Sequence, residues 1–284
     1  MNILETTTGP LSYFDNGCIE GDAPHLMLLH SGAASHRQWK ALIADLGRHW
    51  HVVAPDLIGH GETPMPGHDN PMLEEEAGRL TALLERMDGP VHLVGHSYGG
   101  ALALELARRQ PHRIASLAMY EPVAFGLLRD SSHRDGWHEI STLGQRQIEL
   151  VACGEMRAAA IAFLDYWIRP GALLALPDHM QAYIMGCMPA VAAEFRALFD
   201  VGNTAADFTM LTMPVLLLCG SEATLAVRGV VAELRRLLPG PRDVTLAGAA
   251  HMAPLIRPDL VNPLLIDFLD MAARVAGRGL RRAG

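Results

Sequence analysis

The stretch GHSYGG at residues 95–100 decides the fold of this chain. It follows a short apolar run at 91–94 and precedes a segment at 99–110 that repeats Ala and Leu and stops at Pro111. A serine between glycines on a strand-to-helix turn indicates a strained backbone whose neighbours must be small. The N–H groups that open the following helix point toward the same spot, where they suit a developing oxyanion. We therefore expect Ser97 to be a nucleophile, with an ordinary glycine-rich turn as the alternative.

Short apolar runs closed by Gly or Pro recur along the chain and predict strands that are buried on both faces. They lie at 25–29, 51–54, 91–94, 114–120, 214–219 and 244–246. Helical patterns at 73–87, 99–110, 226–238 and 259–276 separate or follow them. The first 25 residues alternate around Gly9-Pro10 and predict a hairpin. The alternation of strand and helix predicts an α/β fold with a doubly wound, mostly parallel sheet of about eight strands.

The segment at 123–205 interrupts this alternation. It contains no clear buried strand, and its helical patterns, punctuated by prolines that include Pro189, lie at 139–150, 155–168, 178–188 and 190–200. Because both ends of the segment fall between strand-like runs, we expect a helical cap inserted after the sixth strand. The core domain would then consist of residues 1–122 and 206–284. A separate small helical domain is the alternative.

Composition excludes several classes of protein. Half of the 284 residues are hydrophobic, which supplies a large core and excludes a wholly disordered chain. The net charge of −8, with no basic run, is a poor match to nucleic acid or to an anionic membrane surface. The four cysteines form no CxxC pair, so we expect no metal site and a reduced, cytoplasmic chain. A signal peptide and an 18-residue apolar span are not evident, and the oligomeric state stays open.

A second candidate catalytic residue follows the last predicted strand. Gly248-Ala249-Ala250-His251 places a histidine on a loop at the end of that strand. Catalytic groups gather at the carboxyl ends of strands in open α/β sheets, so His251 is well placed to reach Ser97. The alternative is one surface histidine among the 14 in the chain.

These motifs, together with His30-Ser31-Gly32 and DLIGHG at 56–61, resemble the α/β-hydrolase superfamily, in order and in spacing. The resemblance spans residues from about 10 to 270, apart from the cap. It implies that the backbone N–H groups of Gly32 and Tyr98 form an oxyanion hole, and that His30 is structural. It further implies an acyl-enzyme on Ser97, with His251 as the base and with no metal or organic cofactor.

The sequence departs from the family at the acid that should orient His251. In most relatives an Asp lies three residues after the Gly that ends the strand before the last, but here that position is Ala223. Glu222 is adjacent, yet one residue earlier its side chain should point elsewhere. Glu121 ends the run at 114–120, and some members of the superfamily, certain haloalkane dehalogenases among them, look similar in using this earlier strand end. We favour Glu121, with Glu222 as the alternative.

The most plausible function is a serine hydrolase for a small, largely apolar carboxylic ester. A thioesterase, a carbon–carbon bond hydrolase and a cofactor-free perhydrolase stay open. Ala223 keeps a non-catalytic, ligand-binding protein of the same fold as the alternative. The apolar residues of the cap suggest that the small-molecule substrate has an apolar acyl or aromatic group. The alternative is that these residues form the core of the cap itself. They are Met156, Met180, Met185, Met188, Phe163, Trp167 and Phe195.

Overall fold

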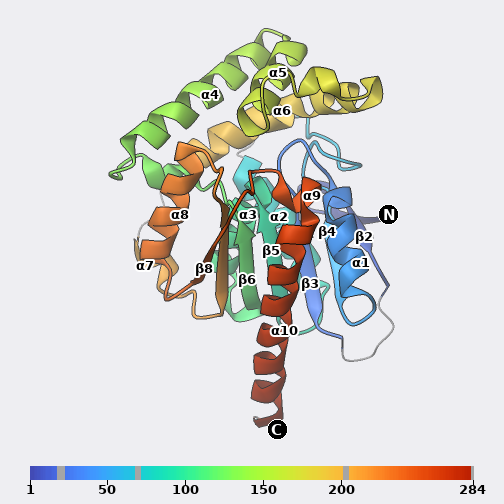
Figure 1. Cartoon of the computed structure of the whole chain (residues 1–284). Coiled ribbons are helices and arrows are strands. Elements are labelled where there is room, and N and C mark those ends of the chain that lie inside the picture. The colour runs from blue at the N-terminus through green and yellow to red at the C-terminus, as the bar shows by residue number, and fades with distance from the viewer. Residues whose placement is uncertain (18–22, 68–71, 201–204, 283–284) are drawn as a thin grey trace.

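An eight-stranded sheet in the order β1-β2-β4-β3-β5-β6-β7-β8 is the frame of the molecule in the computed structural model (Figure 1). The structure describes residues 1–17, 23–67, 72–200 and 205–282. The strands are β1 (Asn2–Thr6), β2 (Gly9–Asp15), β3 (His25–Leu29), β4 (His51–Pro55), β5 (Val91–His96), β6 (Ile114–Tyr120), β7 (Val215–Gly220) and β8 (Arg242–Leu246). β2 pairs antiparallel with β1 and β4, and all other pairs are parallel. The predicted fold class is confirmed.

Helices cover both faces of this sheet (Figure 1). They are α1 (Lys40–Leu46), α2 (Met72–Glu85), α3 (Tyr98–Arg109), α4 (Arg134–Ala152), α5 (Met156–Trp167), α6 (Asp178–Asp200), α7 (Ala205–Phe208), α8 (Leu225–Leu237), α9 (Ala253–Ile256) and α10 (Pro258–Arg282). α1 and α10 pack on one face, and α2, α3 and α8 pack on the other. The fold is therefore doubly wound.

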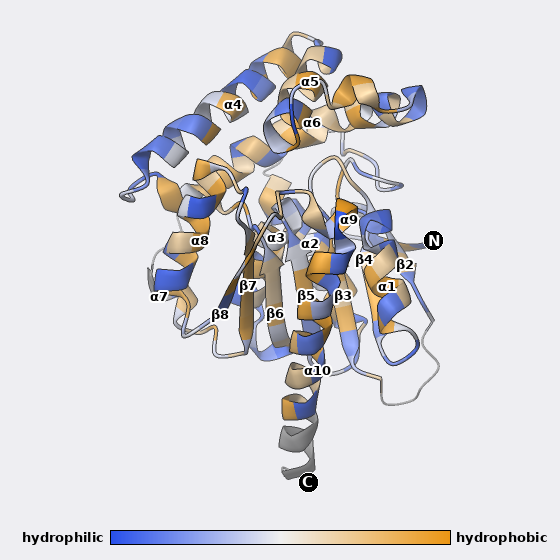
Figure 2. Cartoon of the chain, viewed as in Figure 1, coloured by the Kyte–Doolittle hydropathy of each residue, from blue (hydrophilic) through white to orange (hydrophobic). Residues whose placement is uncertain are grey.

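Side chains of the central strands point alternately to the two faces of the sheet, and each face packs into its own hydrophobic cluster. In β3, Leu26 and Leu28 belong to the cluster under α10, whereas Met27 and Leu29 belong to the cluster under α3. All four side chains are fully buried. Successive side chains of a strand point to opposite faces, so a continuous apolar run is the pattern of a strand with helices on both sides. Figure 2 shows the resulting concentration of hydrophobic residues along the central strands.

The predicted hairpin near the N-terminus is present, because β1 and β2 pair antiparallel and their turn at residues 7–8 directly precedes Gly9-Pro10. One local expectation needs correction. The helical patterns at 178–188 and 190–200 are one continuous helix, α6, with Pro189 inside it. A proline in a helix interior costs about 3 kcal/mol. Burial on both sides of the proline offsets that cost, because Met188, Ala190 and Val191 are essentially inaccessible to solvent.

The three helices α4, α5 and α6 lie between β6 and β7 in the chain and extend over the carboxyl ends of the parallel strands (Figure 1). They pack mainly against one another, and α4 also contacts α8. By length and composition α6 is the one described helix apolar enough to cross a membrane, but half of its apolar window is buried inside the protein. The division into a core of 1–122 and 206–284 and a cap of 123–205 stays a prediction.

If the inserted helices are a cap, they should open more readily than the sheet. Their amide protons, across residues 139–200, are expected to exchange with solvent faster than those of 91–95 and 214–219. The reason is that segments opening over a site exchange through local unfolding, whereas central strands exchange only when the domain opens. Native-state hydrogen exchange followed by mass spectrometry measures this difference. Equal protection in both regions would mean that the chain opens as one body.

Candidate active site

One edge of the sheet gathers the residues that the sequence singled out. His30 follows β3, Ser97 follows β5, Glu121 follows β6, and His251 lies in the loop after β8. All four strands are parallel, so their carboxyl ends meet at the same edge, which is where open α/β sheets place their sites. The inserted helices cover this edge (Figure 1).

Ser97 lies on a turn that only small neighbours allow. Its backbone adopts φ 55° and ψ −118°, in the region that L-residues rarely occupy. A Cβ atom at Gly95 would lie 2.3 Å from the Gly99 carbonyl oxygen, and one at Gly99 would lie 2.3 Å from the Leu29 carbonyl oxygen. The Ser97 N–H donates to the Tyr120 carbonyl at 3.1 Å and so fixes the turn to β6. The predicted strained turn is present.

The structure brings Ser97, His251 and Glu121 into one hydrogen-bonded chain. Ser97 Oγ is 2.9 Å from His251 Nε2, and Glu121 Oε2 is 2.7 Å from His251 Nδ1. A carboxylate accepts hydrogen bonds, so Nδ1 carries the proton and Nε2 is free to accept from the serine hydroxyl. All three side chains are buried, with 6%, 4% and 0% of their surface exposed. This tautomer is the one that a general base requires.

Glu121, and not position 223, supplies the carboxylate that contacts His251. Its second oxygen, Oε1, accepts a hydrogen bond from the Gly220 N–H at 2.8 Å, at the end of the neighbouring strand β7. Ala223 is buried there and offers no acceptor side chain. Glu222 is exposed, and its Oε1 accepts instead from the Ser221 hydroxyl at 3.2 Å. The predicted contact between Glu121 and His251 is therefore present, and Glu222 takes no part in it.

Gly32 and Tyr98 lie beside Ser97 and line the same pocket. In the described part of the chain, neither backbone N–H donates to a protein acceptor. Tyr98 opens α3, where the first N–H groups have no partner within the helix, and Gly32 is partly exposed. The structure thus brings together the two amides that the sequence nominates as an oxyanion hole, and both are free to donate.

Two buried histidines hold the loop that carries Gly32. His30 donates from Nδ1 to the Ser31 carbonyl at 2.7 Å and accepts from the Leu57 N–H at 2.9 Å. His60 accepts from the Ala33 N–H at 2.9 Å, and its own Nδ1 donates to the Ile58 carbonyl, also at 2.9 Å. Burial lowers the pKa of His30 to about 4 and that of His60 to about 3, so both rings are neutral near pH 7. His30 is structural, as expected.

Half of the residues that line the pocket next to Ser97 are aromatic. Besides Gly32, Ser97 and Tyr98, it is lined by Val123, Phe125, Phe163, Trp167, Glu194, Phe195 and Leu198. Trp167, the last residue of α5, stacks on His251 with ring centroids 3.9 Å apart and planes inclined by 25°. An inserted helix therefore covers one member of the hydrogen-bonded chain directly.

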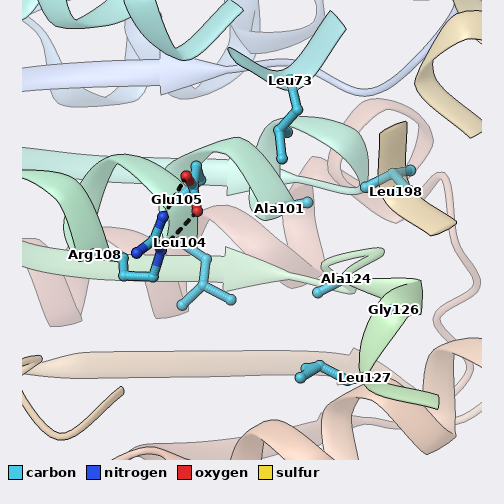
Figure 3. Close-up of a pocket in the computed structure, with 9 residues that line it drawn as sticks. All are labelled: Leu73, Ala101, Leu104, Glu105, Arg108, Ala124, Gly126, Leu127 and Leu198. Atoms are coloured by element: carbon cyan, nitrogen blue, oxygen red, sulfur yellow. Dashed lines mark hydrogen bonds and ion pairs between the residues drawn. The ribbon is translucent and has the colours of Figure 1, made fainter. Parts of the chain in front are cut away.

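A second pocket lies away from these groups, between α3, the turn at 125–128 and the end of α6 (Figure 3). Its polar pair is already satisfied, because Arg108 donates two hydrogen bonds to Glu105 at 2.8 and 2.9 Å. Ser97 does not line it. Among the described residues, no three His, Cys, Asp or Glu side chains are grouped so as to hold a metal ion.

A sequence model described as the alpha/beta hydrolase fold matches residues 24–258, which include the whole hydrogen-bonded chain. The protein belongs to this family. The enol-lactonase from Burkholderia xenovorans LB400 has the same fold, with a TM-score of 0.78 and 22% sequence identity over 95% of this chain and 100% of that one.

Two curated relatives of this alpha/beta hydrolase are also similar in sequence. The pimeloyl-[acyl-carrier protein] methyl ester esterase of Aromatoleum aromaticum is 26% identical over 87% of this chain and 98% of its own. The 2-hydroxy-6-oxo-2,4-heptadienoate hydrolase of Pseudomonas putida is 35% identical over 98 residues, which is 33% of this chain and 36% of the relative. The aligned part thus spans about a third of that relative's length.

The sequence did not indicate the roles of two side chains that line the pocket of this alpha/beta hydrolase, Trp167 and Glu194. Trp167 was counted only among the apolar residues of the cap, and nothing local indicates that it stacks on His251. Glu194 lies within an apolar helical pattern, where a carboxyl group is unusual. This residue type in that pattern was the sequence signal for Glu194, and the structure shows the residue to be only 4% exposed.

The buried neutral state of His60 predicts how its contribution to stability varies with pH. The unfolded chain binds a proton on this ring below pH 6.5, whereas the folded chain does so only near pH 3, so the contribution is lost as pH falls through this range. We expect the destabilisation caused by His60→Gln to be about 2 kcal/mol smaller at pH 5 than at pH 7.5. Denaturant unfolding at both pH values measures it. The exposed His112→Gln is the control, and a pH-independent effect of His60→Gln would contradict the assignment.

Proposed function

We propose that this protein is a serine hydrolase that cleaves a small, largely apolar carboxylic ester through an acyl-enzyme. The observation that carries the proposal is the continuous chain from Ser97 Oγ to His251 and Glu121, with contacts of 2.9 and 2.7 Å, at the mouth of an aromatic pocket. A nucleophile within hydrogen-bond reach of a base, which is itself oriented by a third group, is the arrangement that activates a serine.

The proposed reaction has two halves. Ser97 Oγ attacks the ester carbonyl carbon while its proton passes to His251 Nε2, and Glu121 stabilises the imidazolium that forms. The carbonyl oxygen, now negative, accepts from the N–H groups of Gly32 and Tyr98, and His251 then gives its proton to the departing alcohol. A water molecule, deprotonated by the same histidine, attacks the acyl-enzyme and releases the acid. These steps use no metal and no organic cofactor.

The pocket supports an apolar substrate. Its lining contains four aromatic side chains besides Tyr98 and no Lys or Arg, so a substrate carboxylate would lack a positive partner. Besides the hydroxyls of Ser97 and Tyr98, Glu194 supplies the polar group of this lining. We propose a small molecule as the binding partner, and neither nucleic acid nor a membrane. The proposed location is the cytoplasm.

A second candidate is a carbon–carbon bond hydrolase, because the same serine, base and oxyanion donors serve a ketone substrate. The similarity to the 2-hydroxy-6-oxo-2,4-heptadienoate hydrolase supports it over about a third of the chain. A cofactor-free perhydrolase is a further alternative, because it would use the same serine and histidine. A non-catalytic binding protein is the alternative that rests on the missing acid at Ala223, and the contact between Glu121 and His251 argues against it.

The nucleophile is tested by Ser97→Ala. Removing a triad serine costs on the order of 10⁶ in kcat, so hydrolysis of p-nitrophenyl butyrate should fall to the background of the assay. The fold should persist, because the change only removes a hydroxyl from a turn that is held by backbone bonds. Circular dichroism and labelling of the wild type with a serine-directed phosphonate complete the test. An active Ser97→Ala variant would refute the nucleophile.

The acid is tested by a matched pair of variants. Glu121→Gln should lower kcat by about 10³–10⁴, or roughly 4–5.5 kcal/mol of barrier, because an amide does not support the imidazolium. The exposed Glu222→Gln should cost less than about tenfold, because it takes no part in orienting the base. Steady-state kinetics with one ester give both values. If the two variants exchange rank, the acid is Glu222 and the assignment of Glu121 fails.

A further inference from the structure

Glu194 is a carboxyl group in the wall of the catalytic pocket that the proposed mechanism does not use. It comes from the C-terminal half of α6, is 4% exposed and lines the pocket together with Ser97 and Gly32. Its Oε2 approaches the oxyanion loop so closely that a Cβ atom at Gly32 would lie 2.8 Å from it. The group therefore borders the place where the substrate carbonyl oxygen would sit.

One carboxyl oxygen of Glu194 lacks a partner. Oε1 is buried and forms no hydrogen bond with any residue that the structure describes. His60 Nε2 lies 3.5 Å away, but that nitrogen already accepts from the Ala33 N–H, and the ring's one proton is on Nδ1. At 3.5 Å, and with its lone pair already engaged by Ala33, this nitrogen forms neither an ion pair nor a hydrogen bond with Glu194. A buried polar atom left in this way is costly unless a ligand satisfies it.

The surroundings of Glu194 favour its uncharged form. Burial raises its pKa well above the ordinary value for a glutamate, and the carboxyl of Glu76, on α2, raises it further. A negative charge at this point would also repel the oxyanion that forms beside Gly32. A neutral carboxyl, by contrast, carries an O–H group, which is a hydrogen-bond donor.

We propose that Glu194 is the specificity-determining residue of this site, and that its protonated carboxyl donates a hydrogen bond to an uncharged oxygen of the substrate close to the scissile carbonyl. An ether, hydroxyl or keto oxygen on one of the first acyl carbons has this chemistry. The inference rests on the proposed function. The hydroxyl of Tyr98, which is buried without a partner and belongs to a residue of the same pocket, is a second polar atom available there. The remaining lining is apolar, so the preferred acyl group is an oxygen-bearing but otherwise apolar chain.

Two esters of equal size separate this preference from general activity. In p-nitrophenyl methoxyacetate an ether oxygen replaces one methylene of p-nitrophenyl butyrate. The ratio of kcat/KM for the two esters is measured for the wild type, Glu194→Leu and Glu194→Gln, so that the different intrinsic reactivities of the esters cancel. Loss of one hydrogen bond should lower the ratio in Glu194→Leu on the order of five- to thirtyfold. Glu194→Gln keeps an N–H donor and should change the ratio by less than about threefold.

Two control measurements distinguish a specific role of Glu194 from a general effect on activity or stability. Glu149→Leu removes an exposed glutamate from α4 and should leave the ratio unaltered. Thermal unfolding should show Glu194→Leu to be at least as stable as the wild type, because the variant removes an unpartnered buried carboxyl. An unchanged ratio in Glu194→Leu overturns the assignment, and so does an equal loss in Glu194→Gln, which would mean that a charged carboxylate is required. If the wild type cleaves neither ester, the proposed function itself fails, and the assignment with it.

Discussion

The site depends on backbone that is held in an unfavourable conformation. In the described part of the chain, three residues other than glycine have positive φ, namely Ala33, Ser97 and Glu121. They belong to the loop that carries Gly32, to the turn after β5 and to the end of β6. Each such residue costs on the order of 1–3 kcal/mol and persists only where the surrounding structure imposes it. Here the parallel sheet imposes it, because each of the three segments leaves a strand at the same edge and is tied by hydrogen bonds to a neighbouring segment.

The sheet also explains why the acid can come from β6 instead of β7. The ends of these two strands are adjacent in a parallel pair, so side chains from either can approach the loop that carries His251. The carboxylate of Glu121 reaches across and accepts from both the Gly220 N–H and the His251 Nδ1–H. The histidine therefore has a carboxylate acceptor although position 223 is an alanine. What the chemistry requires is an acceptor at one point in space, and two strand ends can supply it.

Local signals account for what the sequence predicted. Buried strands are short apolar runs, and the serine turn forces glycine at positions 95 and 99, so both are visible without any long-range information. The continuity of α6 through Pro189 was missed because it depends on burial against other helices, which outweighs a local penalty. The stacking of Trp167 on His251 joins residues 84 positions apart, and no spacing rule connects them. Packing between elements decides both features.

The inserted helices and the sheet edge contribute different parts of the site. Ser97, Glu121 and His251 come from strand ends, which a rigid parallel sheet holds in place. Trp167 and Glu194 come from α5 and α6, which cover that edge and determine what can approach it. A change in these helices can therefore alter the wall of the pocket without moving Ser97, His251 or Glu121. Because Trp167 stacks on His251, however, a displacement of α5 also changes the surroundings of that histidine. The inserted helices are thus coupled to the hydrogen-bonded residues of the sheet edge through this stacking contact.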